Sequence, residues 1–127
     1  MRELQKFTAS YQRELDWQIS DEDYQQTKES LLHNYMLLTT EVAEVAEEFR
    51  KAFNMVYKES VNGADPDVAF AEAKSLIQKD VGKELADCIA YICKFANFFE
   101  IDLEETFYEK MDEVKNRSNK NRKLPTY

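Results

Sequence analysis

Two pairs of carboxylates are the residues of this sequence best suited to chemistry. Glu84 and Asp87 are three residues apart, and Glu41 and Glu44 have the same spacing earlier in the chain. Side chains at positions i and i+3 of an α-helix lie on one face, so each pair points one way if its segment is helical. If the two helices pack together, four carboxylates meet, and they repel each other unless cations neutralise them. The spacing therefore predicts a divalent-metal site.

The candidate ligands are all oxygen atoms, which favours Mg²⁺, or Mn²⁺ as a substitute, over zinc. His33 is the only histidine, so a di-iron bundle with two Glu-x-x-His units is excluded. A Walker-type loop and a Gly-rich dinucleotide turn are also absent. Mg²⁺ held by carboxylates keeps positions open for water and phosphate oxygens, and Glu44 or Glu48 is a candidate to orient the attacking water.

The simplest alternative is that each acid pair is only a solvated helix face. With 25 acids in 127 residues, acid-x-x-acid pairs arise by chance. However, both pairs flank the most apolar helical segments, and Glu84 and Asp87 lie on one strip with Tyr91 rather than with lysines. Acids and an aromatic residue on one strip are what a lined pocket would have, and this favours the site.

The composition predicts one all-α domain over residues 1–127, most simply a bundle of four or five helices. Only two Gly and two Pro occur, too few for the many turns of a β-sandwich or barrel. No run of about 18 apolar residues predicts a membrane span, and the N-terminus lacks a signal-peptide pattern. Cys88 and Cys93 are five residues apart on one predicted helix, which is poor geometry for a disulfide, so we expect free thiols in a reducing cytoplasm.

Apolar periodicity and capping residues delimit the first two helices. The first should cover residues 2–17, with an apolar stripe of Leu4, Phe7, Tyr11 and Leu15 and with Trp17 at its end. Ser20 is the predicted N-cap of the second helix, which should start at 21 or 24 and end near 58. Asn62 and Gly63 then form a predicted turn.

Two further helices follow this turn. Asp65 and Pro66 should start the third, which is expected to run from about 67 to 99, with Gly82 marking either a break or a close crossing. Asp102 and Glu105 form a capping box that starts the last, over about 103–117. This last helix is expected to bury Leu103, Phe107, Met111 and Val114.

The charge is divided unevenly along the chain. Residues 110–127 carry about +4, so the rest must carry about −12 to give the net −8. An acidic body argues against duplex nucleic acid as a ligand, because phosphate contacts drive that binding. The basic residues from 118 to 127 are expected to form a flexible tail, and a basic segment of this kind can hold a small polyphosphate.

Glu41-Val-Ala-Glu44 followed by Glu84-Leu-Ala-Asp87 resembles the paired acidic signature of the MazG-like all-α nucleoside triphosphate pyrophosphohydrolases. The similarity covers about residues 30–58 and 80–117 and includes the run from Phe95 to Glu105 and the Lys110-Met111 pair. The resemblance implies Mg²⁺-dependent hydrolysis of (d)NTPs to monophosphate and pyrophosphate by a homodimer or homotetramer. It also implies a role in removing non-standard or excess nucleotides.

The resemblance assigns roles to particular positions. It makes Glu41, Glu44, Glu84 and Asp87 the metal ligands. It further implies nucleotide contacts at Trp17, Tyr91, Asn97, Lys110, Asn116 and Arg117. Three features depart from the family pattern. Thr40 stands where a further Glu is common, the gap between the acid pairs holds 39 residues (45 to 83) and is longer than usual, and the last helix ends in a different sequence.

Two other functions compete with this one. The nearest is a dUTPase-like or other phosphohydrolase acting on a diphosphate-containing nucleotide. The more distant is a helical interaction module without enzymatic activity. The acid strip separates both enzymes from the module, because only the enzymes need it.

Overall fold

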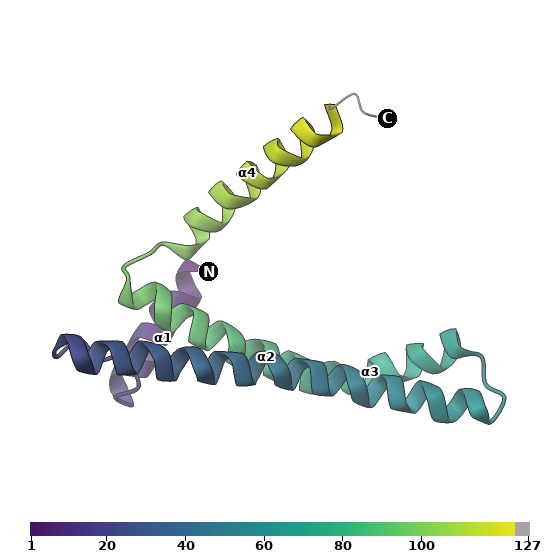
Figure 1. Ribbon diagram of the computed structural model, residues 1–127. Coiled ribbons are helices and arrows are strands. Elements are labelled where there is room, and N and C mark those ends of the chain that lie inside the picture. Colours follow the sequence, from purple (N-terminus) through teal and green to yellow (C-terminus); the bar gives the residue numbers. More distant parts are fainter. Residues whose placement is uncertain (124–127) are drawn as a thin grey trace. The chain divides into compact units, whose positions relative to one another are not determined.

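The computed structural model describes residues 1–123, and this part of the chain contains four α-helices and no strand. The helices are α1 (Arg2–Glu14), α2 (Tyr24–Val61), α3 (Pro66–Phe98) and α4 (Leu103–Lys123) (Figure 1). This confirms the all-α prediction, with the smaller of the two expected helix counts. The chain divides into two compact units, residues 19–92 and residues 1–18 together with the chain from 93 onward.

The unit of residues 19–92 is a hairpin in which α2 and α3 run antiparallel, side by side (Figure 1). Gly63 closes the turn with a φ of 93°, a conformation that favours glycine. The Asp65 Oδ2 atom accepts a hydrogen bond from the Val68 backbone N–H at 3.3 Å, and Pro66 occupies the first helical position. The predicted turn and the predicted start of α3 are confirmed.

Helix α2 starts at Tyr24, one of the two predicted positions, but its N-cap differs from the prediction. Asp23, not Ser20, is the N-cap: its backbone is extended and its Oδ1 atom accepts from the Gln26 N–H at 2.8 Å. The Ser20 backbone N–H donates instead to Ser30 Oγ at 3.1 Å, which ties the segment before α2 to the first turns of that helix. Several hydroxyl and acidic residues here can cap a helix, and local sequence does not rank them.

The core of the hairpin is small. Ala52 and Ala73 are 0 % and 1 % exposed, and with Ile77 they form the buried seam between α2 and α3. Gly82 lies inside the unbroken α3, and a Cβ atom added to it would meet nothing within 4 Å. Gly82 therefore marks neither a helix break nor a close helix crossing.

Much of the apolar surface predicted to face a core is exposed in this hairpin. Two facing helices can bury only one stripe of each helix, so apolar residues on either side of the seam stay at the surface. Phe53 is 60 % exposed, and Tyr35 and Val42 are similarly open. The periodicity indicated the apolar faces correctly, but one hairpin does not cover them.

In the second unit, polar contacts join α1 to the α3–α4 connection. Arg2 donates to Asp102 at 2.8 Å and to Glu104 at 2.7 Å. The amide of Gln5 donates to the Ile101 carbonyl at 2.7 Å and accepts from the Leu103 N–H at 2.9 Å. Asp102 also caps α4 by accepting from the Glu105 N–H at 3.1 Å, as the predicted capping box requires. The hydrogen bond from Arg2 lowers the pKa of Asp102.

The apolar faces of α1 and α4 are open rather than buried. In α1 the buried side chains are Gln5 and Gln12, whereas Phe7 on the apolar stripe is 66 % exposed. In α4 the expectation of burial is wrong for Phe107, Met111 and Val114, all of which are exposed. Polar anchoring of α1 accounts for this arrangement, because the helix turns its amides, not its apolar stripe, toward its neighbours.

Both ends of this unit also differ from the predicted boundaries. Helix α1 ends at Glu14, and Asp16 has a φ of 56°, so Trp17 lies beyond the helix. Helix α4 continues to Lys123, so residues 118–123 are helical rather than a frayed tail, and the remainder of the predicted tail, 124–127, lies outside the described residues. Among the described residues, no helix has the length and apolarity needed to span a membrane.

Candidate functional site

Three of the four predicted acids converge between α2 and α3. One carboxylate oxygen from each of Glu41, Glu84 and Asp87 lies within 4.8 Å of the others. Glu41 and Glu84 are half-buried, and Asp87 is exposed, so the group opens to solvent on one side. No ion pair to any of the three occurs among the described side chains. We call these three residues the acid cluster.

The acid cluster is electrostatically strained without a cation. The pKa of Glu41 is raised, first by burial and then by the negative charges of Asp87 and Glu84, with hydrogen bonds between the carboxyl groups adding to the effect. An all-oxygen donor set that opens to solvent suits Mg²⁺ or Mn²⁺. The residues therefore fit a divalent cation.

Tyr91 and Cys88 border the cluster on α3. Burial raises the pKa of the Tyr91 phenol, and the negative charges of Glu41 and Asp87 raise it further, so the phenol lies near these acids. Burial and then the acids likewise raise the pKa of the Cys88 thiol. A thiol held in its protonated form is a poor nucleophile, which agrees with a packing role for Cys88.

Glu44, the fourth predicted ligand, is exposed and does not belong to the acid cluster. Its charge acts instead on Lys51, whose pKa it helps to raise. The structure therefore brings together one member of the first acid pair and both members of the second. The i, i+3 spacing puts Glu41 and Glu44 on the same side of α2, but only the Glu41 carboxylate lies close to Glu84 and Asp87 of α3.

The sequence did not reveal that Glu48 is buried. Glu48 is 7 % exposed, its Oε1 atom accepts from Lys51 Nζ at 2.9 Å, and its Oε2 atom is buried with no hydrogen-bond partner among the described residues. The hydrogen bond from Lys51 to Glu48 raises the pKa of Lys51 most, followed by the charges of Glu48, Asp80 and Glu44. The Glu48–Lys51 spacing is visible in the sequence, but the burial depends on packing against α3.

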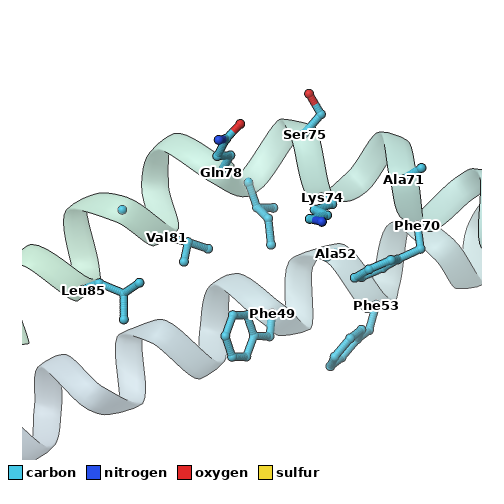
Figure 2. Close-up of a pocket in the computed structure, with 12 residues that line it drawn as sticks. Phe49, Ala52, Phe53, Phe70, Ala71, Lys74, Ser75, Gln78, Val81 and Leu85 are labelled. Carbon is cyan, nitrogen blue, oxygen red and sulfur yellow. The ribbon is translucent and has the colours of Figure 1, made fainter.

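An apolar groove runs along one face of the hairpin (Figure 2). It encloses about 760 Å³ and is lined chiefly by Phe49 and Phe53 of α2 and by Phe70, Val81 and Leu85 of α3. At about 100° per residue, Phe49 and Lys51 lie about 200° apart around α2, and Leu85 and Asp87 are related in the same way on α3. The face opposite the groove thus carries Asp87 and Lys51, and we call it the acidic face. Glu41 lies about 20° from Ala52 on α2, and Glu84 about 20° from Ile77 on α3, so these two acids lie along the buried seam.

The other predicted nucleotide contacts belong to the second unit. Asn97 is already engaged: its Oδ1 accepts from the Gln5 side chain at 3.4 Å, and its Nδ2 donates to the Gln5 carbonyl at 3.1 Å. Lys110 and Arg117 both donate to Glu113, at 3.2 and 2.9 Å. Trp17 and Asn116 are exposed, and the Trp17 ring meets Tyr11 edge to face. Their roles toward a nucleotide stay predictions.

Comparison with protein families agrees with this arrangement. The sequence model of the MazG nucleotide pyrophosphohydrolase domain matches residues 26–121, which include every residue of the acid cluster. The match makes the chain, in general terms, a helical hydrolase of nucleotides. The chain belongs to the MazG nucleotide pyrophosphohydrolase family. Comparisons with curated proteins and with solved structures gave no match.

Proposed function

We propose that this protein is a Mg²⁺-dependent pyrophosphohydrolase that converts (d)NTPs to (d)NMPs and pyrophosphate. The observation that carries the proposal is the convergence of Glu41, Glu84 and Asp87 within a chain of the MazG family. A helical interaction module has no need of three converging carboxylates, two of which raise the pKa of the third, Glu41.

Glu41, Glu84 and Asp87 would hold the Mg²⁺ ion, with Mn²⁺ as a possible substitute, and Glu44, which lies outside the acid cluster, would act on the water rather than as a fourth ligand. When bound, such an ion neutralises phosphate charge and lowers the pKa of a coordinated water. The raised pKa of Glu41 means that this carboxyl holds a proton more readily than an ordinary glutamate and releases it when a cation enters. The exposure of Asp87 leaves the cluster open on the side from which a substrate would enter.

The proposed reaction cleaves one phosphoanhydride bond. A water oxygen bonds to the α-phosphorus, the bond from that phosphorus to the bridging oxygen breaks, and pyrophosphate leaves. The proton of the water passes to a carboxylate, for which Glu44 is our candidate because it is exposed and one turn from Glu41.

Tyr91 is the nucleotide contact that the hairpin itself supports, because its phenol lies beside the acid cluster. Trp17 as a base-stacking residue, and Lys110, Asn116 and Arg117 as phosphate contacts, stay part of the proposal on the strength of the family pattern. Asn97 would have to exchange its two hydrogen bonds with Gln5 for bonds to a nucleoside.

We further propose that the protein is a homodimer or homotetramer. The aromatic groove supports this, because an exposed apolar patch of this kind commonly marks a protein interface. A second copy laid into the groove would bury Phe49, Phe53 and Phe70 and leave the acid cluster, on the other face, open.

One panel of assays tests the function directly. Purified protein is incubated with each (d)NTP and dNDP and with Mg²⁺, and pyrophosphate and orthophosphate are measured separately. Pyrophosphate from triphosphates supports the proposal, and activity on dUDP or other diphosphates supports the dUTPase-like alternative. We place the enzyme in the removal of non-standard or excess nucleotides in the cytoplasm, in keeping with its two free, buried cysteines.

A further inference from the structure

Lys51 and Glu48 form a charged pair that the chemistry proposed above does not use. The carboxylate of Glu48 is almost fully buried and accepts from the Lys51 ammonium at 2.9 Å, while the Lys51 side chain is 59 % exposed. The buried carboxylate of Glu48 therefore fixes the position of the exposed ammonium of Lys51. An ordinary surface pair, with both partners in water, would not fix the lysine in this way.

The ammonium of Lys51 lies on the side of the hairpin on which Asp87, the exposed member of the acid cluster, opens to solvent. Lys51 feels the charge of Asp80, and Asp80 and Asp87 are seven residues apart and so share one side of α3. Lys51 lies opposite Phe49 around the helix and so points away from the aromatic groove. The acid cluster and Lys51 consequently face the same solvent region.

The distance between Lys51 and the acid cluster suits a chain of phosphates. Ten residues of helix separate Glu41 from Lys51, about 15 Å along the axis. The hydrogen bond to Glu48 places the ammonium of Lys51 about three residues closer to the helix N-terminus, the direction in which helical side chains lean. The axial distance from this ammonium to Glu41 is then about 10 Å. An extended triphosphate with its linking oxygens approaches this span, whereas a single phosphate held at the cluster does not.

We propose that Lys51 is a phosphate-binding residue of this site: its ammonium, positioned by Glu48, binds the terminal phosphate of a nucleoside triphosphate whose inner phosphates lie at Glu41, Glu84 and Asp87. The inference rests on the proposed function and narrows its substrates to triphosphates. A divalent cation at the acid cluster would offset two of its three negative charges and would offer open positions to phosphate oxygens, so the acids would not keep the phosphates away.

The test measures binding of inorganic tripolyphosphate and of pyrophosphate by calorimetry, at saturating Mn²⁺, for wild type, Lys51→Gln, Lys51→Arg and Lys58→Gln. Lys58 is the matched control, because it is an exposed lysine on the same side of α2, two turns farther from the cluster. Loss of one charge-assisted hydrogen bond should weaken tripolyphosphate binding about tenfold in Lys51→Gln. Lys51→Arg should restore most of it, and pyrophosphate binding should change little.

Steady-state kinetics supply a second readout. In Lys51→Gln the KM for a nucleoside triphosphate should rise about tenfold with a smaller change in kcat. In Glu48→Gln, which keeps an acceptor but loses the charge, the KM should rise by less than in Lys51→Gln. A structural role alone would lower the melting temperature without this division between KM and kcat.

Three results would overturn the inference. Tripolyphosphate binding by Lys51→Gln that equals wild type would do so, as would an equal loss for Lys58→Gln, which would indicate only a general charge effect. Wild-type protein that binds Mn²⁺ but no tripolyphosphate would also overturn it and leave the cation site intact. Absence of Mn²⁺ binding by the wild type would instead overturn the proposed function, and this inference with it.

Discussion

Two groups of acids on the same hairpin differ in their counter-charge. In the first group, Glu48 accepts a hydrogen bond from the ammonium of Lys51, and the charges of Glu44 and Asp80 also act on this ammonium. Glu41, Glu84 and Asp87 converge within 4.8 Å but form no ion pair among the described side chains. Burial and then the charges of Asp87 and Glu84 raise the pKa of Glu41. In the first group, the chain itself supplies a cation that pairs with Glu48. The second group, the acid cluster, can instead bind a cation from solution. This difference identifies the acid cluster as the functional part of the hairpin.

The largest effect should come from removing a cluster carboxylate. Glu84→Gln should lower kcat/KM for nucleoside triphosphates by more than about a hundredfold, because a bound metal contributes several kcal/mol to a transition state of this kind. The measurement is pyrophosphate release at saturating Mg²⁺. Asp67→Asn is the control: it removes an exposed acid from the first turn of the same helix. Equal losses in the two variants would show that the cluster has no special role.

The aromatic face should respond to charge in a different way from the acidic face. Phe53→Glu puts a carboxylate into the apolar groove, so we expect the homo-oligomer to dissociate, seen as a lower mass by light scattering after gel filtration. Tyr57→Glu is the control, because Tyr57 is as exposed but does not line the groove. An unchanged mass for Phe53→Glu, with wild type oligomeric, would place the subunit interface elsewhere.

The strained cluster also predicts a pH dependence of stability. The pKa of Glu41 is raised in the folded state, so its contribution favours the folded state below the unfolded value of about 4.5 and is lost as pH rises through the folded value. In EDTA, the melting temperature of Glu41→Gln relative to wild type should therefore increase as pH rises from 4 to 7. A constant difference across this range would contradict the strain assigned to Glu41.

The smallest effect concerns Gly82, which lies between Asp80 and Glu84 on α3. Gly82→Ala should stabilise the protein by about 0.5–1 kcal/mol, because the helix has room for the Cβ atom and alanine is the better helix former. Denaturant unfolding measures this gain. Activity should stay unchanged, since neither group of acids has to move. Gly82 also lines the aromatic groove, so the gain applies to the protein diluted to the monomer. A loss of stability in the monomer would contradict the room assigned to the Cβ atom.

The sequence predicted the helices and the acid cluster better than it predicted burial. The turn at Gly63, the caps at Asp65 and Asp102, and the all-α class follow from local chemistry and are confirmed. Burial depends on which faces meet. Periodicity alone therefore failed for Phe107 in α4 and did not reveal that Glu48 is buried.

The same limit applies to the acids. The spacing of Glu41 and Glu44 is the same as that of Glu84 and Asp87, and it does not say which member of a pair meets the other helix. Only the packing of α2 against α3 distinguishes Glu41 from Glu44. The spacing predicted a metal site, and the family pattern supplied the nucleotide substrate, which no spacing rule contains. The family pattern gave no role to Lys51, because the position of its ammonium depends on the hydrogen bond to the buried carboxylate of Glu48.

The central claim is that Glu41, Glu84 and Asp87 together bind a divalent cation. Calorimetric titration of metal-free protein with Mn²⁺ tests it most directly, with wild type, the double variant Glu84→Gln/Asp87→Asn, and Asp67→Asn as the control. We predict saturable binding by wild type and by Asp67→Asn and none by the double variant. Binding of equal affinity and stoichiometry in all three proteins would contradict the claim.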